Sequence, residues 1–257
     1  MQDYSTRRLS YPNIDKFPAI AGVAQAFASL TNDEYIAGFF KKTLPQALLW
    51  QHAYPLLKAT QPASGKYRCP SWSWAKTDMP VELHAGSLKN SGVARVVDIN
   101  IDPEDPQNPF GRLKDARLEL QGWVVPFHWL APDPTAVEEQ DPSVVPGHWD
   151  DSIETKPVRN PSPISTNVIG HELVARVITF DFAAYLYEDE EDSYVMPIET
   201  DSGRHEIRGL ILRKIVNGGQ SVYMRVGKTK LFVARGHPHP TIMEHFKQMP
   251  KVNIILV

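Results

Sequence analysis

Apolar residues near the start of the chain recur at the three- and four-residue spacing of a helix face. In residues 17–31 these positions are Ile20, Val23, Ala24 and Phe27. The spacing predicts one helix. Two more short helices are expected over 33–40, which opens with two acidic residues, and over 44–54, where Pro45 suits a first turn. We therefore expect residues 1–56 to form a short helical part.

Beyond residue 56 the apolar positions alternate or form short runs, which is typical of strands. Strands are expected at 71–75, 92–101, 112–130, 171–182, 195–198, 207–233 and 252–257. The Asn-Gly-Gly sequence at 217–219 predicts a hairpin, and residues 131–168, rich in Pro, Asp, Ser and Glu, predict a long surface loop. The expected fold class is α+β, mainly β. The short helical N-terminal part packs on an antiparallel β-barrel or sandwich formed by 57–257, in a single domain over 1–257.

Two tryptophans stand two positions apart in the sequence SWSWA. Residues i and i+2 of a strand point to one face, so we expect Trp72 and Trp74 side by side, each more than half buried. Such a pair forms either the centre of a core or the wall of a pocket. The sequence leaves both interpretations open.

Composition and charge exclude several classes of function. The 257 residues carry a formal net charge of -3, without the basic excess of a nucleic-acid-binding protein. The single cysteine, Cys69, excludes an intrachain disulfide and fits a reducing compartment. The first residues lack the apolar core of a secretory signal, and no run of about 18 apolar residues predicts a membrane span. We expect a cytoplasmic protein that binds neither nucleic acid nor membrane, with its oligomeric state left open.

Sequence motifs for cofactors and metals are missing. The chain has no phosphate-binding glycine loop, no dinucleotide fingerprint and no zinc-protease motif. His237 and His239 have the spacing of metal ligands, but the adjoining prolines favour a surface turn. The acidic run 188–192 lacks the pattern of a calcium loop, and Cys69 is interpreted as a small, semi-buried apolar residue. We expect neither a cofactor nor a metal.

The aromatic residues are the strongest candidates for a binding site. Small-molecule pockets are mostly apolar with a few polar anchors, although the same rings equally fill a core. The candidate substrate-binding residues are Trp50, Trp72, Trp74, Trp123, Trp129, Tyr187 and Tyr223. The candidate catalytic residues are His52 and His128, which stand beside these rings in the sequence, and Arg213 and Arg225 of the hairpin, which would bind a carbonyl or an anion.

Seven segments occur in a characteristic order along nearly the whole chain: YSTRRLSYPNIDKFPAIAGVAQAF, DEYIAGFFKKTLPQALLW, CPSWSWAKTDMPV, NPFGRLKDARLELQGWVV, YVMPI, GLILR and YMRVG. In this order and spacing they resemble the region that follows the HET (heterokaryon incompatibility) domain in fungal proteins. The sequence departs from that pattern in lacking the HET domain itself, and locally at Lys76 and Met79.

The resemblance implies two alternative functions. Stand-alone chains similar to this region include cofactor-free hetero-Diels–Alderases of fungal secondary metabolism, which join a tropolone-type quinone methide to a sesquiterpene alkene. Such an enzyme would hold two apolar, conjugated substrates in an aromatic pocket. A His or Arg anchor would polarise a carbonyl or assist a dehydration that forms the diene. The alternative is a HET-related allorecognition or binding module without enzymatic activity.

Overall fold

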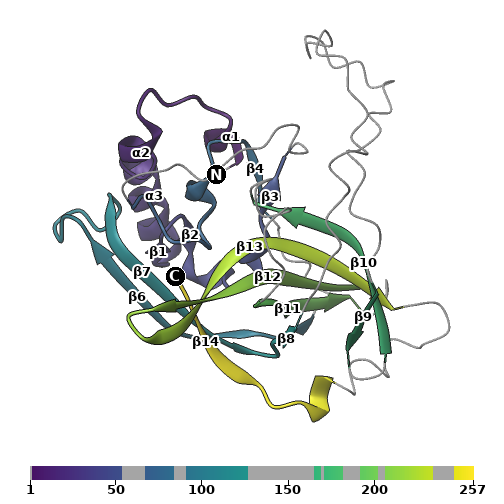
Figure 1. Cartoon of the computed structure of the whole chain (residues 1–257). Helices are drawn as coiled ribbons and strands as arrows, with labels where there is room; N and C mark the ends of the chain where they lie inside the picture. The colour runs from purple at the N-terminus through teal and green to yellow at the C-terminus, as the bar shows by residue number, and fades with distance from the viewer. Residues whose placement is uncertain are drawn as a thin grey trace, which may run out of the picture.

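The computed structural model describes residues 2–53, 67–83, 91–126, 165–168, 171–181, 192–201, 206–233 and 246–257. The described part is mainly β, with short helices gathered at one side of a curved sheet (Figure 1). This confirms the mainly β, α+β prediction, while the choice between barrel and sandwich stays a prediction. No helix in the described ranges is long and apolar enough to cross a membrane.

Three α-helices open the chain: α1 (Gln2–Ser5), α2 (Pro12–Asp15) and α3 (Pro18–Thr31). The long helix α3 confirms the prediction made from apolar spacing. Pro18 stands in its first turn, where a missing backbone N–H costs nothing. It ends at Asn32, which adopts the left-handed conformation (φ 48°) and donates its backbone N–H to the Ala28 carbonyl.

The prediction of a helix over 33–40 is wrong. This segment forms a small hairpin of β1 (Tyr35–Ile36) and β2 (Phe39–Phe40). The reason lies in the turn between them, where Ala37 (φ 43°) and Gly38 (φ 103°) have positive φ angles that no right-handed helix contains. The acidic pair that suggested a helix start therefore precedes a turn.

The prediction of a helix over 44–54 is also largely wrong. After the 3₁₀ turn η1 (Lys41–Thr43), this segment contains a second 3₁₀ turn, η2 (Gln46–Leu49), and strand β3 (Gln51–His52). Strand β3 pairs with β4 (Val81–Glu82). Within the described residues 2–53, the N-terminal part is therefore α-helical only as far as residue 31.

The SWSWA segment is buried as predicted, but it is not a strand. Trp72 lies in a turn and Trp74 begins the 3₁₀ turn η3 (Trp74–Lys76). Ser73 caps η3, because its hydroxyl oxygen accepts the backbone N–H of Ala75 at 3.1 Å. Serine side chains compete with strand ladders in this way. Both indoles nevertheless have no solvent exposure.

The remaining strands form one ten-stranded sheet (Figure 1). They are β5 (Ser91–Gly92), β6 (Arg95–Pro103), β7 (Leu113–Gly122), β8 (Val125–Pro126), β9 (Ser165–Val168), β10 (His171–Phe180), β11 (Ser193–Asp201), β12 (Glu206–Asn217), β13 (Gln220–Val233) and β14 (Val252–Leu256). The main path runs β5-β11-β12-β13-β14-β7-β6, and β10 lies beside β13. The pairs are antiparallel as predicted, except that β14 runs parallel to β13.

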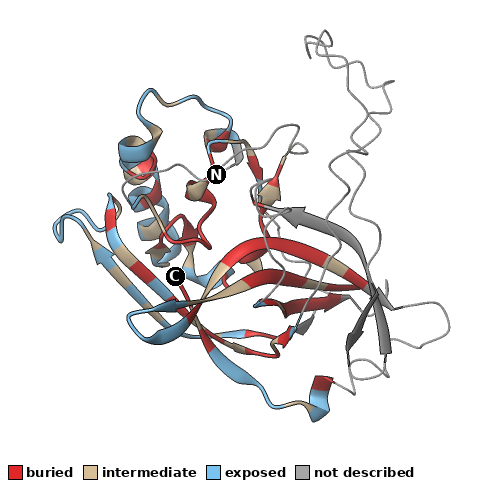
Figure 2. Ribbon diagram, in the orientation of Figure 1, coloured by how far each residue is buried: buried red, intermediate tan, exposed pale blue. Residues whose placement is uncertain are grey.

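The predicted hairpin is confirmed, with its turn at Gly218 (φ 58°) and Gly219 (φ 80°). The core fills the space between the N-terminal part and the face of the sheet that carries Leu210 and Leu212, which we call the inner face. Figure 2 shows buried residues along β12 and β13, with exposed residues over much of α2 and α3. The 3₁₀ turn η2 packs against both β11 and β12.

Candidate functional site

A buried arginine joins the N-terminal part to the sheet. Arg225 of β13 has no solvent exposure. Its guanidinium donates from Nε to the Leu48 carbonyl at 3.0 Å, from Nη2 to the Trp50 carbonyl at 2.6 Å, and from Nη1 to the Asp181 carboxylate. The guanidinium carbon also lies 3.9 Å from the centre of the Trp50 ring. The five donors of the planar group suit such a site, which a lysine cannot match.

The carboxylate that neutralises Arg225 comes from the end of β10. Asp181 is 2% exposed, and its backbone N–H donates to the Val226 carbonyl at 2.9 Å. One carboxylate oxygen accepts from Arg225, and the other, Oδ2, has no hydrogen-bond partner in the described ranges. Sequence reasoning missed Asp181. Its only signal was a single acidic residue near the end of an apolar strand.

His52 of β3 completes the cluster with Arg225 and Asp181. Its Nε2 lies 2.8 Å from the carbonyl oxygen of Asp181, so Nε2 carries the proton and donates it. Burial lowers the pKa of His52, and the Arg225 charge adds to this effect while the contacts with Asp181 oppose it. The ring is therefore neutral at pH 7. Its second nitrogen, Nδ1, is a buried acceptor that no described residue meets with a hydrogen bond.

A lysine lies beside this cluster. Lys76 ends η3, and its ammonium donates to the Arg225 carbonyl at 3.3 Å. Burial is the main cause that lowers the pKa of Lys76 to about 8; Asp181 opposes the shift and Arg225 supports it. The sequence showed Lys76 only as a departure from the resembled family. An amine with a pKa near neutrality can donate or accept a proton at physiological pH.

The tryptophans predicted to bind substrate pack as core around the cluster. Trp50, Trp72 and Trp74 have no solvent exposure and belong to one apolar cluster. The Trp50 indole donates to the Trp72 carbonyl at 3.0 Å, and the Trp74 indole donates to the Gly38 carbonyl at 2.7 Å. The Trp72 ring stacks on Phe39, with centroids 6.3 Å apart. These contacts favour the core interpretation of the SWSWA rings.

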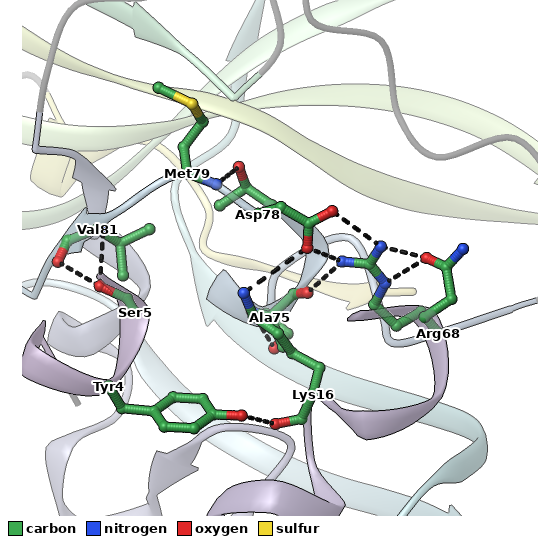
Figure 3. A network of polar contacts seen from close by, with 11 residues as sticks. Tyr4, Ser5, Lys16, Arg68, Ala75, Asp78, Met79 and Val81 are labelled. Carbon is green, nitrogen blue, oxygen red and sulfur yellow. Dashed lines mark hydrogen bonds and ion pairs between the residues drawn. The ribbon is translucent and has the colours of Figure 1, made fainter. Parts of the chain in front are cut away.

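A second polar network joins Lys16, Arg68 and Asp78 (Figure 3) and lies beside Trp74. The guanidinium of Arg68 bonds Asp78 at 2.7 Å and also reaches the Ala75 carbonyl. The Lys16 ammonium lies 3.7 Å from the Asp78 carboxylate and 5.7 Å from the centre of the Trp74 ring. Burial is the first cause that lowers the pKa of Lys16. This network ties the N-terminal helices to the SWSWA segment.

The two arginines of the hairpin do not share a face. Arg225 pairs with Leu212, whereas Arg213 pairs with Met224 one residue along. Successive residues of a strand point to opposite faces, so only Arg225 lies on the inner face. Tyr223 pairs with Lys214 and shares the face of Arg225, where its ring meets Tyr194 edge to face with centroids 5.8 Å apart.

Trp123 has partners outside the tryptophan cluster. Its ring lies 5.3 Å from Phe246, its indole donates to the Met249 carbonyl at 3.2 Å, and the Lys251 ammonium lies 4.7 Å from the ring centre. The remaining candidates, His128, Trp129 and Tyr187, fall outside the described residues, as do the histidines at 237 and 239 and positions 131–164 of the loop expected over 131–168. The end of that loop prediction is wrong, because Ser165–Val168 form strand β9.

Cys69 is a poor nucleophile, because burial raises the pKa of its thiol to about 12. Within the part of the chain that the structure describes, no three His, Cys, Asp or Glu side chains are grouped as metal ligands.

No family model matches the chain, and no curated protein or solved structure is significantly similar to it. The chemistry that the site could perform is therefore inferred from its geometry. The cluster of His52, Asp181, Arg225 and Lys76 combines a neutral imidazole, a carboxylate, a fixed cation and an amine of lowered pKa. This combination suits proton transfer to and from a bound hydroxyl or carbonyl group.

Proposed function

We propose that this chain is a cofactor-independent enzyme of fungal secondary metabolism, acting in the cytoplasm. It generates a conjugated diene from a small apolar substrate by acid–base chemistry and joins it to an alkene in a hetero-Diels–Alder cycloaddition. The resemblance described above suggests the reaction class. The buried cluster of His52, Asp181, Arg225 and Lys76 suggests where the proton transfers occur.

One observation carries the proposal: the Nδ1 atom of His52 is a buried acceptor with no hydrogen-bond partner among the described residues. Leaving a buried polar atom unmet costs about 1–3 kcal/mol. Such an atom in a folded protein calls for an explanation, and a catalytic role is one of them. Since the Asp181 carbonyl fixes the proton on Nε2, Nδ1 stays available as a base.

The proposed dehydration starts from a hydroxymethyl-substituted phenol or tropolone. His52 Nδ1 takes the ring hydroxyl proton, and the ammonium of Lys76 donates a proton to the departing side-chain hydroxyl, which leaves as water. The product is a quinone methide. The alkene then adds across it, forming one C–C and one C–O bond with no further proton transfer. General acid–base catalysis contributes typically 10²–10⁴-fold, and positioning of the two partners adds to it.

The test compares two variants from the same strand. His52→Gln removes the basic nitrogen, whereas Gln51→Ala changes the neighbouring residue, which is only partly buried and bonds Glu82. Purified protein is mixed with a 2-hydroxymethylphenol and excess alkene, and the cycloadduct is measured by liquid chromatography against the uncatalysed background. We expect His52→Gln to lower kcat by about 10²–10⁴, while Gln51→Ala and EDTA leave it unchanged.

Circular dichroism must show that both variants fold. Trp74→Ala is unsuitable as a test, since removing a fully buried tryptophan costs about 3–5 kcal/mol and unfolding would mask any effect on the reaction. Equal turnover in His52→Gln and Gln51→Ala, or no product above background from the wild-type chain, contradicts the proposal.

The alternative, a HET-related allorecognition or binding module, is favoured by the exposed face of α3. Val23 is 71% exposed, Phe27 50% and Leu30 85%, and their spacing places them along one side of the helix. Exposed apolar patches often mark protein interaction sites. Sedimentation of wild type and the Val23→Ser/Leu30→Ser double variant tests this function. If the wild-type chain associates, the double variant does not, and neither shows turnover, the module is favoured. If the wild-type chain shows turnover that only His52→Gln abolishes, the enzyme is favoured.

A further inference from the structure

A bulge in β13 brings three cationic residues to the inner face of the sheet. Ile211 of β12 pairs with Gly227, but the next residue, Leu212, pairs with Arg225, so Val226 is an extra residue in the ladder. Without the bulge Arg225 and Lys228, three positions apart, would lie on opposite faces. With it, Arg225, Lys228 and Lys230 follow one another on the inner face.

Two of these cations have carboxylate partners. Arg225 pairs with Asp181. Lys230 lies 3.9 Å from Glu206, which also pairs with Arg208 of β12. Their charges are therefore compensated inside the fold.

Lys228 differs from its neighbours. It is 8% exposed, and no hydrogen bond or ion pair of its ammonium occurs in the described part of the chain. Its cross-strand neighbours are Leu210 on β12 and Thr179 on β10, neither of which is charged. A buried ammonium without a counter-charge is unfavourable, and the group responds by losing its proton more easily.

The positive charges around Lys228 add to the effect of burial on its pKa. Burial is the largest cause that lowers its pKa to about 8, followed by the charges of Arg225, Lys230 and Arg208. Glu82 of β4 is the opposing charge and has a smaller effect. At pH 8 about half of the Lys228 amines are therefore uncharged and nucleophilic.

We propose that Lys228 is a covalent binding site for a small aldehyde or ketone, which it captures as a Schiff base. The neutral amine attacks the carbonyl carbon, and the C–N bond forms as the C=O electron pair moves to oxygen. After proton transfer from nitrogen to oxygen, the carbinolamine loses water to leave the C=N bond. The step is redox-neutral and releases one water.

This site uses no atom of His52, so it is independent of the proposed cycloaddition. Lysines made nucleophilic by desolvation and by neighbouring cations are a known route to covalent catalysis. Lys228 is 8% exposed, and Leu210 and Leu212 lie beside it on the inner face, so the site would suit a small, apolar carbonyl compound.

The experiment treats the full chain with butanal and sodium cyanoborohydride at several pH values and measures alkylation of each lysine by peptide mass spectrometry. We expect Lys228 to react about 10-fold faster than Lys230 or Lys247 at pH 7. Its rate should rise with pH and level off above about pH 8. His52→Gln should keep this labelling, which separates a failure here from a failure of the proposed function.

Two matched variants locate the reaction. Lys228→Arg should remove the fast-reacting site, and Lys230→Arg, which changes the ion-paired neighbour, should keep it. The comparison of lysines within the wild-type chain decides the question even where Lys228→Arg fails to fold. Labelling of Lys228 at or below the rate of Lys247, or a rate that stays level between pH 7 and pH 9, overturns the proposal.

Discussion

Replacing Arg225 by methionine removes the cation that forms an ion pair with the Asp181 carboxylate. Asp181 is 2% exposed, so the carboxylate remains in a site that water scarcely reaches. Breaking a buried ion pair from one side costs about 3–5 kcal/mol, because the remaining charge is left uncompensated. The carbonyls of Leu48 and Trp50 also lose a charged donor. We expect Arg225→Met to lower the free energy of unfolding by about 3–5 kcal/mol.

A double-mutant cycle separates the charge from the hydrogen bonds. Asp181→Asn alone should cost about 1–3 kcal/mol, because Arg225 keeps its two carbonyl acceptors. The double variant should be more stable than the sum of the two single losses predicts, by at least about 1 kcal/mol, since no buried carboxylate is left alone in it. Arg225→Lys should fall between wild type and Arg225→Met, because an ammonium cannot span all three acceptors.

Urea unfolding followed by tryptophan fluorescence and circular dichroism measures these free energies. The guanidinium lies 3.9 Å from the centre of the Trp50 ring, so fluorescence also reports its removal directly. Two results would show that the pair is not a charge-compensating contact. One is a loss in the double variant that equals the sum of the two single losses to within about 0.5 kcal/mol, and the other is a loss below about 1 kcal/mol for Arg225→Met.

Three further predictions follow from burial and backbone geometry. Gly38→Ala should cost about 2–4 kcal/mol in urea unfolding, because φ is +103° and a Cβ would lie 2.7 Å from the Trp74 indole nitrogen; Gly22→Ala, with nothing within 4 Å, should instead be neutral or stabilising. Burial lowers the pKa of His52, so the unfolded state binds the proton more readily, and stability should fall as pH drops below about 6.5. His52→Gln should flatten that fall, and an unchanged pH profile would contradict the assignment. Lys228→Met should raise the free energy of unfolding at pH 7 by about 1–3 kcal/mol, because the folded pKa of Lys228 is about 8 against about 10.4 unfolded. The gain should shrink as pH rises from 8 to 10.5, and thermal melts at these pH values that show no such trend would refute it.

Local features determined which elements could be predicted from the sequence. The spacing of apolar residues in 18–31 requires only contacts three and four positions apart, and it specified α3. The Asn-Gly-Gly turn likewise specified the hairpin of β12 and β13 from adjacent residues. The sequence also predicted that Trp72 and Trp74 are buried, because large rings are rarely left in water, although it could not predict the 3₁₀ turn that holds them.

The candidate site was decided by the tertiary structure. Asp181 and Arg225 stand 44 positions apart, and His52 and Asp181 stand 129 apart, so no local pattern could pair them. The register of the β12–β13 hairpin put Arg213 and Arg225 on opposite faces, and a single extra residue in β13 placed Lys228 on the inner face with Arg225. The pKa of a buried group depends on desolvation and on the charges that distant segments bring to it. Sequence alone therefore named His52 and Arg225 as candidates, and only the fold could add Asp181, Lys76 and Lys228.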